Sequence, residues 1–76
     1  MSDDDLGTFR GLLSGNRGEL WHLRAWVDGN AVACIWSRRK HRWLYQIFHP
    51  WYFDRMFAWD KRPATTPEGW AEMAAA

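Results

Sequence analysis

Apolar residues recur with a helical period at the start of the chain. The large ones in this part are Leu6, Phe9, Leu12 and Leu13. Their spacing places them on one side of a helix, and Ser2 is a suitable N-cap before a run of aspartates that suits a helix start. Gly7 and Gly11 each cost up to about 1 kcal/mol relative to alanine in a helix. We therefore predict an amphipathic helix over residues 2–13 that depends on tertiary support.

From residue 20 the apolar residues alternate with polar ones, which is the period of a strand. Asp28-Gly29 is a two-residue hairpin signal between two such runs. A second turn falls at Arg39-Lys40, and His49-Pro50 ends the third run. The pattern predicts a three-stranded antiparallel meander over residues 20–48.

The two turns predict two hairpin registers that are independent of each other. The first pairs Val27 with Asn30, Ala25 with Val32, Leu23 with Cys34 and Trp21 with Trp36. The second pairs Trp36 with Trp43, Cys34 with Tyr45 and Val32 with Ile47. Both place the same apolar residues on one face, an agreement that a one-residue slip would destroy. The predicted core face consists of Trp21, Leu23, Ala25, Val27, Val32, Cys34, Trp36, Trp43, Tyr45 and Ile47.

The part of the chain after the meander again has a helical period. Pro50 suits the first turn of a helix, and a broad apolar stripe then predicts a helix over residues 50–60. Thr66-Pro67 is another helix start, followed by a short helix or frayed tail over residues 66–76. With both longer helices on the core face, the sequence predicts one small α+β domain over residues 1–76.

Composition adds that the core is built from aromatic residues. Tryptophan, phenylalanine and tyrosine make up 17% of the 76 residues, and Cys34 is the one cysteine. No intrachain disulfide can form, and a lone cysteine suits a reducing cytoplasm. The acidic N-terminus and short apolar runs argue against a signal peptide, a transmembrane helix and a membrane partner. We expect a soluble cytoplasmic protein with some tryptophans at a binding surface.

The second face of the predicted meander mixes aromatic, aliphatic and charged residues, as binding surfaces do. The residues on it that we predict to bind a partner are Arg24, Trp26, Ile35, Arg42, Leu44, Gln46 and Phe48. The alternative is that the C-terminal segment folds back over this face, with Trp70 as a plug. Of the two, we favour a surface for a partner or for self-association.

A cluster of cations at the second turn forms a basic tip of Arg38, Arg39 and Lys40. With a net charge of +1, we favour a solvated turn or contact with an acidic patch on a protein. Nucleic acid is the alternative, with the basic tip and Arg42 on phosphates and Trp26 or Phe48 stacking on bases.

Catalysis and metal binding are not expected. His22, His41, His49 and Cys34 match no zinc-ligand spacing, and the predicted registers place Cys34 and His22 on opposite faces. The carboxylates form no paired arrangement, and no glycine-rich loop follows a strand. We predict no cofactor and no enzyme activity.

The sequence therefore predicts a small binding protein that occupies a surface of a macromolecular partner, most readily a protein. Chains of this size and class are common among phage and mobile-element accessory proteins that inhibit a host enzyme or defence complex, and by that analogy we expect the same role. The alternatives are a nucleic-acid-binding module and a homodimeric structural subunit.

Overall fold

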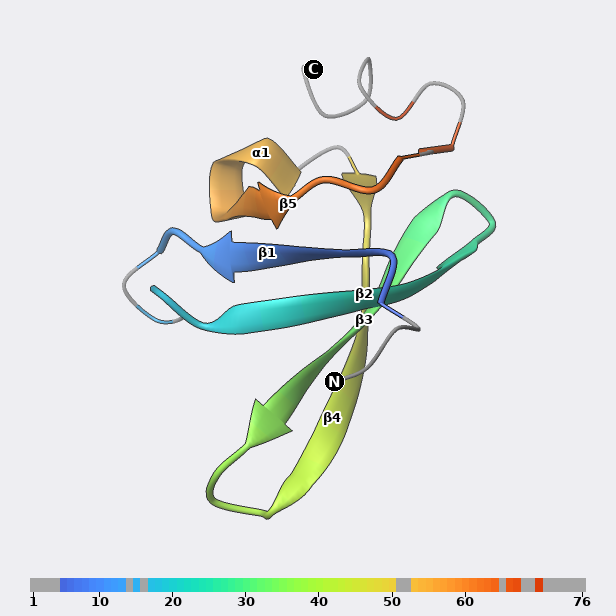
Figure 1. Ribbon diagram of the computed structural model, residues 1–76. Coiled ribbons are helices and arrows are strands. Elements are labelled where there is room, and N and C mark those ends of the chain that lie inside the picture. The colour runs from blue at the N-terminus through green and yellow to red at the C-terminus, as the bar shows by residue number, and fades with distance from the viewer. Residues whose placement is uncertain are drawn as a thin grey trace.

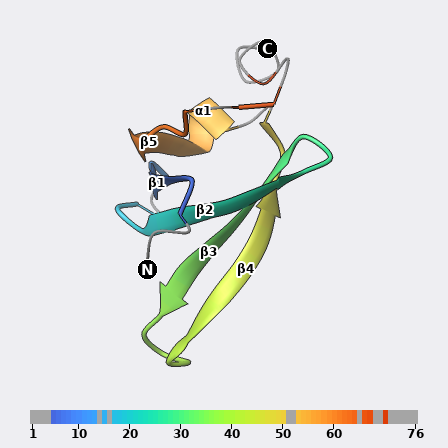
Figure 2. The same ribbon diagram turned by 45° about the vertical axis from the view of Figure 1, so that its right-hand side comes forward.

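The computed structural model describes residues 5–13, 15, 17–50, 53–64, 66, 67 and 70, and these form one five-stranded antiparallel sheet. The elements are β1 (Gly7–Gly11), β2 (Leu20–Val27), β3 (Asn30–Ser37), β4 (Arg42–Phe48), the helical turn α1 (Phe53–Met56) and β5 (Phe57–Lys61). The strand order is β4-β3-β2-β1-β5, so the last strand returns to the free edge of the first. Figures 1 and 2 show β3 and β4 running steeply across the direction of β1, as in a strongly twisted sheet.

The predicted meander is present as β2, β3 and β4. The β3–β4 register is as predicted, with Trp36 opposite Trp43. The β2–β3 register is as predicted from the turn to Ala25 and Val32, and there it shifts at a bulge between Leu23 and Ala25. Beyond the bulge Leu23 lies opposite Ala33, not opposite Cys34.

The bulge exchanges the two faces of β2, so the predicted core face mixes residues of both faces. Trp21, Leu23 and Cys34 are buried as predicted, whereas the residues predicted from β4 are not. An extra residue in one strand inverts the alternation of every side chain beyond it. Leu23 consequently shares the inner face with Ala31 and Ala33, and all three are fully buried. Tyr45 and Ile47, predicted to be core residues, are 62% and 56% exposed on the outer face.

The predicted N-terminal helix is also wrong, because residues 7–11 form β1. Burial alternates along this strand, with Gly7, Phe9 and Gly11 facing inward. A Cβ atom on Gly7 would lie 2.5 Å from the Lys61 carbonyl oxygen of the neighbouring β5. The two glycines that weaken a helix therefore fit a strand, where the backbone of β5 approaches too closely for a side chain at Gly7.

The predicted helix over residues 50–60 is replaced by α1 and β5. Strand β5 pairs with β1, with Phe9 opposite Trp59 and Gly11 opposite Phe57. Phe57 is buried and Ala58 exposed, which is the alternation of a strand. In the sequence, the aromatic residues on both sides of this segment make the same positions resemble the apolar stripe of a helix. The fold class is thus an antiparallel β-sheet, not α+β with two covering helices.

The core is an aromatic cluster around Phe9, which is fully buried. Its ring lies 4.7 Å from that of Phe53 and 5.1 Å from that of Phe57, both edge to face, a geometry that aromatic pairs favour. The cluster comprises Phe9, Trp21, Leu23, Ala31, Ala33, Phe48, Phe53, Phe57 and Trp70.

Trp70 closes the core over the inner face of the meander. It is 2% exposed, and its ring lies 4.5 Å from that of Trp26. The alternative predicted from the sequence, in which Trp70 acts as a plug over this face, is therefore present. Most of the predicted tail over residues 66–76 lies outside the described residues.

Candidate functional site

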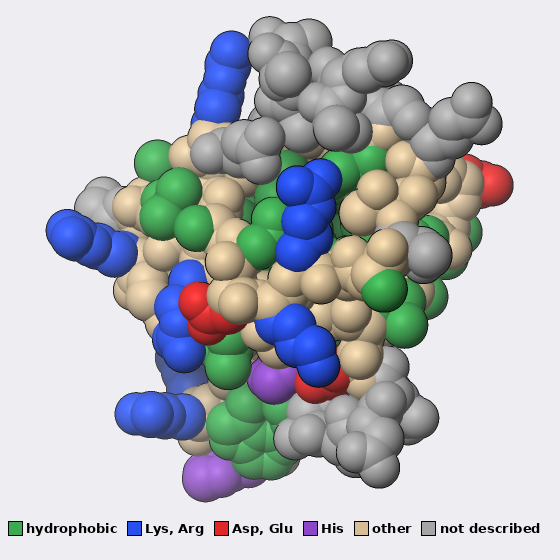
Figure 3. Space-filling view, turned by 45° about the horizontal axis from the view of Figure 1, so that its top comes forward, with side chains coloured by type: hydrophobic (Ala, Val, Ile, Leu, Met, Phe, Trp, Pro, Cys, Tyr) green, Lys and Arg blue, Asp and Glu red, His purple; other side chains and the backbone are tan. Residues whose placement is uncertain are grey.

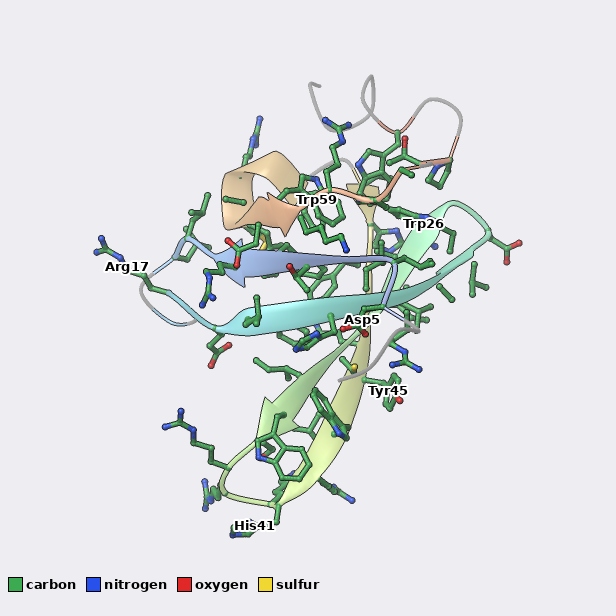
Figure 4. The ribbon with its side chains drawn as sticks, in the orientation of Figure 1. Asp5, Arg17, Trp26, His41, Tyr45 and Trp59 are labelled. Carbon is green, nitrogen blue, oxygen red and sulfur yellow. The ribbon has the colours of Figure 1, made fainter. Side chains whose placement is uncertain are left out.

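A cleft of ≈ 830 Å³ opens between the β1–β2 connection and the β3–β4 hairpin. In Figure 4, Arg17 marks the first of these two walls and His41 the tip of the second. The cleft is lined by Arg10, Arg17, Gly18, Glu19, Leu20, Trp21, Ile35, Trp36, Ser37, Arg38, Arg39 and Leu44. We call it the arginine cleft.

The floor of the arginine cleft is apolar because inner-face residues of the sheet continue into it. Ile35 lies opposite Leu44 in the β3–β4 pair, and both are partly buried. Trp21, on β2, links this floor to the core, in which its ring packs edge to face against Phe48 at 5.0 Å. An apolar ligand group that enters the cleft therefore meets a surface held by the core.

The rim carries four arginines from three segments. Arg10 projects from β1, Arg17 from the β1–β2 connection, and Arg38 and Arg39 from the β3–β4 turn. All four side chains belong to exposed residues. Figure 3 shows lysine and arginine side chains standing out from one face of the molecule, with apolar side chains between them.

Backbone contacts hold the β1–β2 wall of the cleft. The Gly18 amide donates to the Gly11 carbonyl oxygen at 3.0 Å, and Arg17 forms a bridge with Gly11. The Arg10 guanidinium donates to the Gly18 carbonyl oxygen at 3.0 Å and to the Asp60 carboxylate at 2.7 Å. These bonds fix the position of the Arg10 side chain, and the Asp60 carboxylate balances its positive charge.

The β3–β4 wall is set by a turn over residues 38–41. The Lys40 amide donates to the Ser37 hydroxyl oxygen at 3.1 Å, and His41 adopts a positive φ of 52°. Trp36 lies beside this turn, is 46% exposed, and packs against Trp43 with ring centroids 5.4 Å apart. The wall thus presents an exposed indole next to Arg38.

The charge of the chain is concentrated at this cleft. Its lining includes four arginines and one glutamate, a formal charge of +3 in a chain of net charge +1, although Asp60, outside the lining, pairs with Arg10 and offsets one of these charges. The remaining residues together therefore carry −2. A low net charge conceals a cationic site, because charged walls around a cleft focus the local potential.

The structure distributes the predicted site residues over several places. Ile35 and Leu44 meet the basic-tip residues Arg38 and Arg39 in the arginine cleft, while Lys40 lies exposed in the same turn without lining it. Arg42 and Gln46 are exposed on β4.

The other three predicted partner-binding residues lie away from the cleft. Phe48 is 3% exposed within the core, and Trp26 packs under Trp70. Arg24 sits at the β2 bulge, 3.4 Å from the Asp5 carboxylate, which also accepts a hydrogen bond from the His22 ring at 2.7 Å.

Arg10 and Arg17 are the arginines of the cleft that sequence reasoning missed. Both lie far from the basic tip along the chain, and they reach the cleft through the β1–β2 pairing. A single arginine in the sequence does not indicate a site, whereas the cluster of cations at the basic tip does. Only the strand order identifies these two residues.

The described residues offer no cluster suited to metal binding or nucleophilic chemistry. No group of three or more His, Cys, Asp or Glu among them could hold a metal ion. Cys34 is fully buried, and burial raises the pKa of its thiol above the ordinary 9.0, against a smaller opposing effect of Arg24. This thiol is therefore kept neutral and inaccessible.

Comparison of the chain with protein-family models, with curated proteins and with solved structures found no match. Within the described part of the chain, no helix has the length and apolar character needed to cross a membrane. The arginine cleft is therefore interpreted from its own chemistry.

Proposed function

We propose that this chain is a non-enzymatic binding protein that takes an acidic, partly apolar segment of a partner protein into the arginine cleft. One observation carries the proposal: four arginines from three segments surround an apolar floor of Trp21, Ile35 and Leu44. Guanidinium groups bind carboxylates through paired hydrogen bonds, and the floor offers burial to an apolar side chain. A segment with both kinds of side chain uses the whole site.

The apolar floor favours a protein segment over nucleic acid. Nucleic-acid sites combine cations with exposed aromatic faces on which bases stack. Among the apolar residues that line the cleft, Leu20, Ile35 and Leu44 are aliphatic, and Trp36 is the exposed aromatic one. The expected inhibition of a host enzyme by a phage or mobile-element protein rests on chain size alone and stays a prediction.

Single-stranded nucleic acid is the second candidate because of Trp36. Its indole is 46% exposed beside Arg38 and Arg39, an arrangement that supports stacking of one base with contacts to the adjoining phosphates. Such binding weakens steeply with salt, since each neutralised phosphate releases a counterion.

Selection from a displayed library of random twelve-residue peptides tests the proposal. We expect enriched peptides to combine Asp or Glu with large apolar residues, and their affinity to fall at least tenfold for the Arg38→Glu/Arg39→Glu variant. The matched control is Arg55→Glu/Arg62→Glu, which reverses two exposed cations that do not line the cleft and should leave affinity unchanged.

Two results would overturn the protein-segment proposal. One is an enriched set without acidic residues, or no enrichment at all. The other is equal binding by the wild type and the Arg38→Glu/Arg39→Glu variant. A twelve-residue oligothymidylate that binds more tightly than the selected peptides, with a steep salt dependence, would establish the second candidate instead.

A further inference from the structure

Strand β4 is an edge of the sheet, and the part of the chain that the structure describes gives it little of the usual protection against pairing. Within the described residues it pairs only with β3, and that register runs over seven residues without a bulge. Edge strands are normally shielded by proline, bulges, short length or charge. The sequence of β4 contains no proline, and its one charged residue is Arg42 at the end.

Two of the exposed apolar side chains of the outer face lie on this edge strand. Tyr45 is 62% exposed and Ile47 56% exposed, and both point to the same face as Trp43. Figure 4 shows Tyr45 projecting from β4 away from the core. An edge strand that is charged only at Arg42 and presents such side chains is a site for adding a strand.

We propose that β4 pairs antiparallel with β4 of a second copy of this chain, with the two-fold axis at Tyr45. Full pairing of a strand that runs from 42 to 48 places its middle residue opposite itself. The interface is then isologous, as in most homodimers. Two five-stranded sheets become one continuous sheet of ten strands.

The side chains of β4 are complementary to themselves in this register. On the outer face Trp43 lies opposite Ile47 of the second copy, an aromatic and β-branched pair of the favourable kind, and Tyr45 lies opposite Tyr45. On the inner face Leu44 lies opposite Gln46. No position brings like charges together.

Arg42, the one charge in β4, supports a second copy as the occupant. In the proposed register it faces Phe48, and the two Arg42 residues lie six positions apart. At about 3.4 Å per residue this separates them by roughly 20 Å, well beyond the Debye length of about 8 Å at physiological ionic strength. Self-pairing therefore meets no electrostatic penalty at this edge.

The dimer does not rest on the proposed peptide-binding function. Its backbone contacts are made by the outer edge of β4, and Leu44 is the one residue of this strand that also lines the arginine cleft. Failure of either proposal leaves the other standing, because Arg38→Glu/Arg39→Glu is expected to bind peptide at least tenfold more weakly and still dimerise.

A charge-swap experiment by sedimentation velocity tests the dimer. Wild-type protein should sediment with twice the 9.0 kDa mass of the chain. Tyr45→Glu and Tyr45→Lys should each be monomeric, because each places like charges face to face across the axis. An equimolar mixture of the two variants should recover the dimer, and this recovery excludes misfolding as the cause of the loss.

Val27→Glu and Val27→Lys are the matched controls. Val27 is a 48% exposed residue of β2 that pairs with Asn30, away from the β4 edge, so both variants should remain dimeric. A wild-type monomer at the highest soluble concentration would overturn the proposal. So would a dimer that persists in both Tyr45 variants, or a mixture of the two that stays monomeric.

Discussion

At the residue scale, Gly7 determines whether β5 can reach β1. A Cβ atom there would meet the Lys61 carbonyl oxygen at 2.5 Å and the Pro63 ring at 3.0 Å. The obstacle is backbone, which cannot rotate away as a side chain can. We expect Gly7→Ala to lower the free energy of unfolding by about 1–3 kcal/mol, the usual cost of overpacking, measured by urea denaturation.

Gly15→Ala is the control for this prediction. No atom lies within 4 Å of the position that a Cβ on Gly15 would occupy, so its effect should stay within about 0.5 kcal/mol, as for most surface substitutions. Equal effects of the two substitutions would show that β1 and β5 do not approach as closely as described.

Because of Cys34, we expect the stability of the fold to decrease at alkaline pH. Desolvation by burial raises the pKa of the folded thiol, with Arg24 opposing it in part. The folded pKa therefore lies above the unfolded one. The contribution of the neutral thiol to stability is fully present below the unfolded pKa and is lost as pH rises through the folded pKa.

The test compares the wild type with Cys34→Ala, in which this titration is absent. We expect the free energy of unfolding to fall more between pH 7 and pH 10 for the wild type than for the variant. Because other groups titrate in both proteins, the difference between the two curves isolates Cys34. Identical curves would contradict burial of the thiol.

At the scale of elements, the turn between β2 and β3 fixes the register of the meander. Asp28 and Gly29 have positive φ values of 52° and 80°, the conformation that favours Asn-Gly or Asp-Gly in two-residue hairpins. Gly29→Ala should cost about 1–2 kcal/mol of unfolding free energy, the penalty of a left-handed non-glycine residue. Asp28→Asn should cost nothing, and a loss equal to that of Gly29→Ala would contradict this turn type.

The sequence predicted the elements whose pairing is local and missed those whose pairing is distant. Turn residues and alternation determine the β3–β4 register, and Trp36 lies opposite Trp43 as predicted. The bulge near Arg24 has no such signal, and it inverts the alternation at Leu23 and Trp21. The predicted register was extended through a bulge that the sequence does not indicate. It therefore assigned the wrong face of β3 and β4 to the core.

β1 and β5 were predicted as helices because each short segment fits two periods. Phe9 and Leu13 are spaced as on a helix, yet Gly7, Phe9 and Gly11 also alternate. The choice between the periods is made by the pairing of Phe9 with Trp59, fifty residues away. Separation along the chain also explains which residues of the arginine cleft were predicted. Arg38 and Arg39 form a local cluster, whereas Arg10 and Arg17 lie far from it in the sequence.

At the scale of the whole molecule, the core is completed by a residue close to the end of the chain. Trp70 is 2% exposed and packs edge to face against Trp26 at 4.5 Å and Phe53 at 5.6 Å. A domain of this length is stable by only roughly 4–11 kcal/mol. A single buried indole is therefore a large part of what keeps the sheet folded.

Replacing Trp70 tests this dependence. Trp70→Ala should lower the free energy of unfolding by about 3–5 kcal/mol, as for other buried tryptophans, and should shift tryptophan emission to longer wavelength as Trp26 gains solvent. Trp36→Ala is the matched control, since Trp36 is 46% exposed and loses mainly its contact with Trp43, worth about 0.5–1.5 kcal/mol. If the two substitutions cost the same in urea denaturation, Trp70 does not close the core, and the inner face around Trp26 returns as a candidate partner surface.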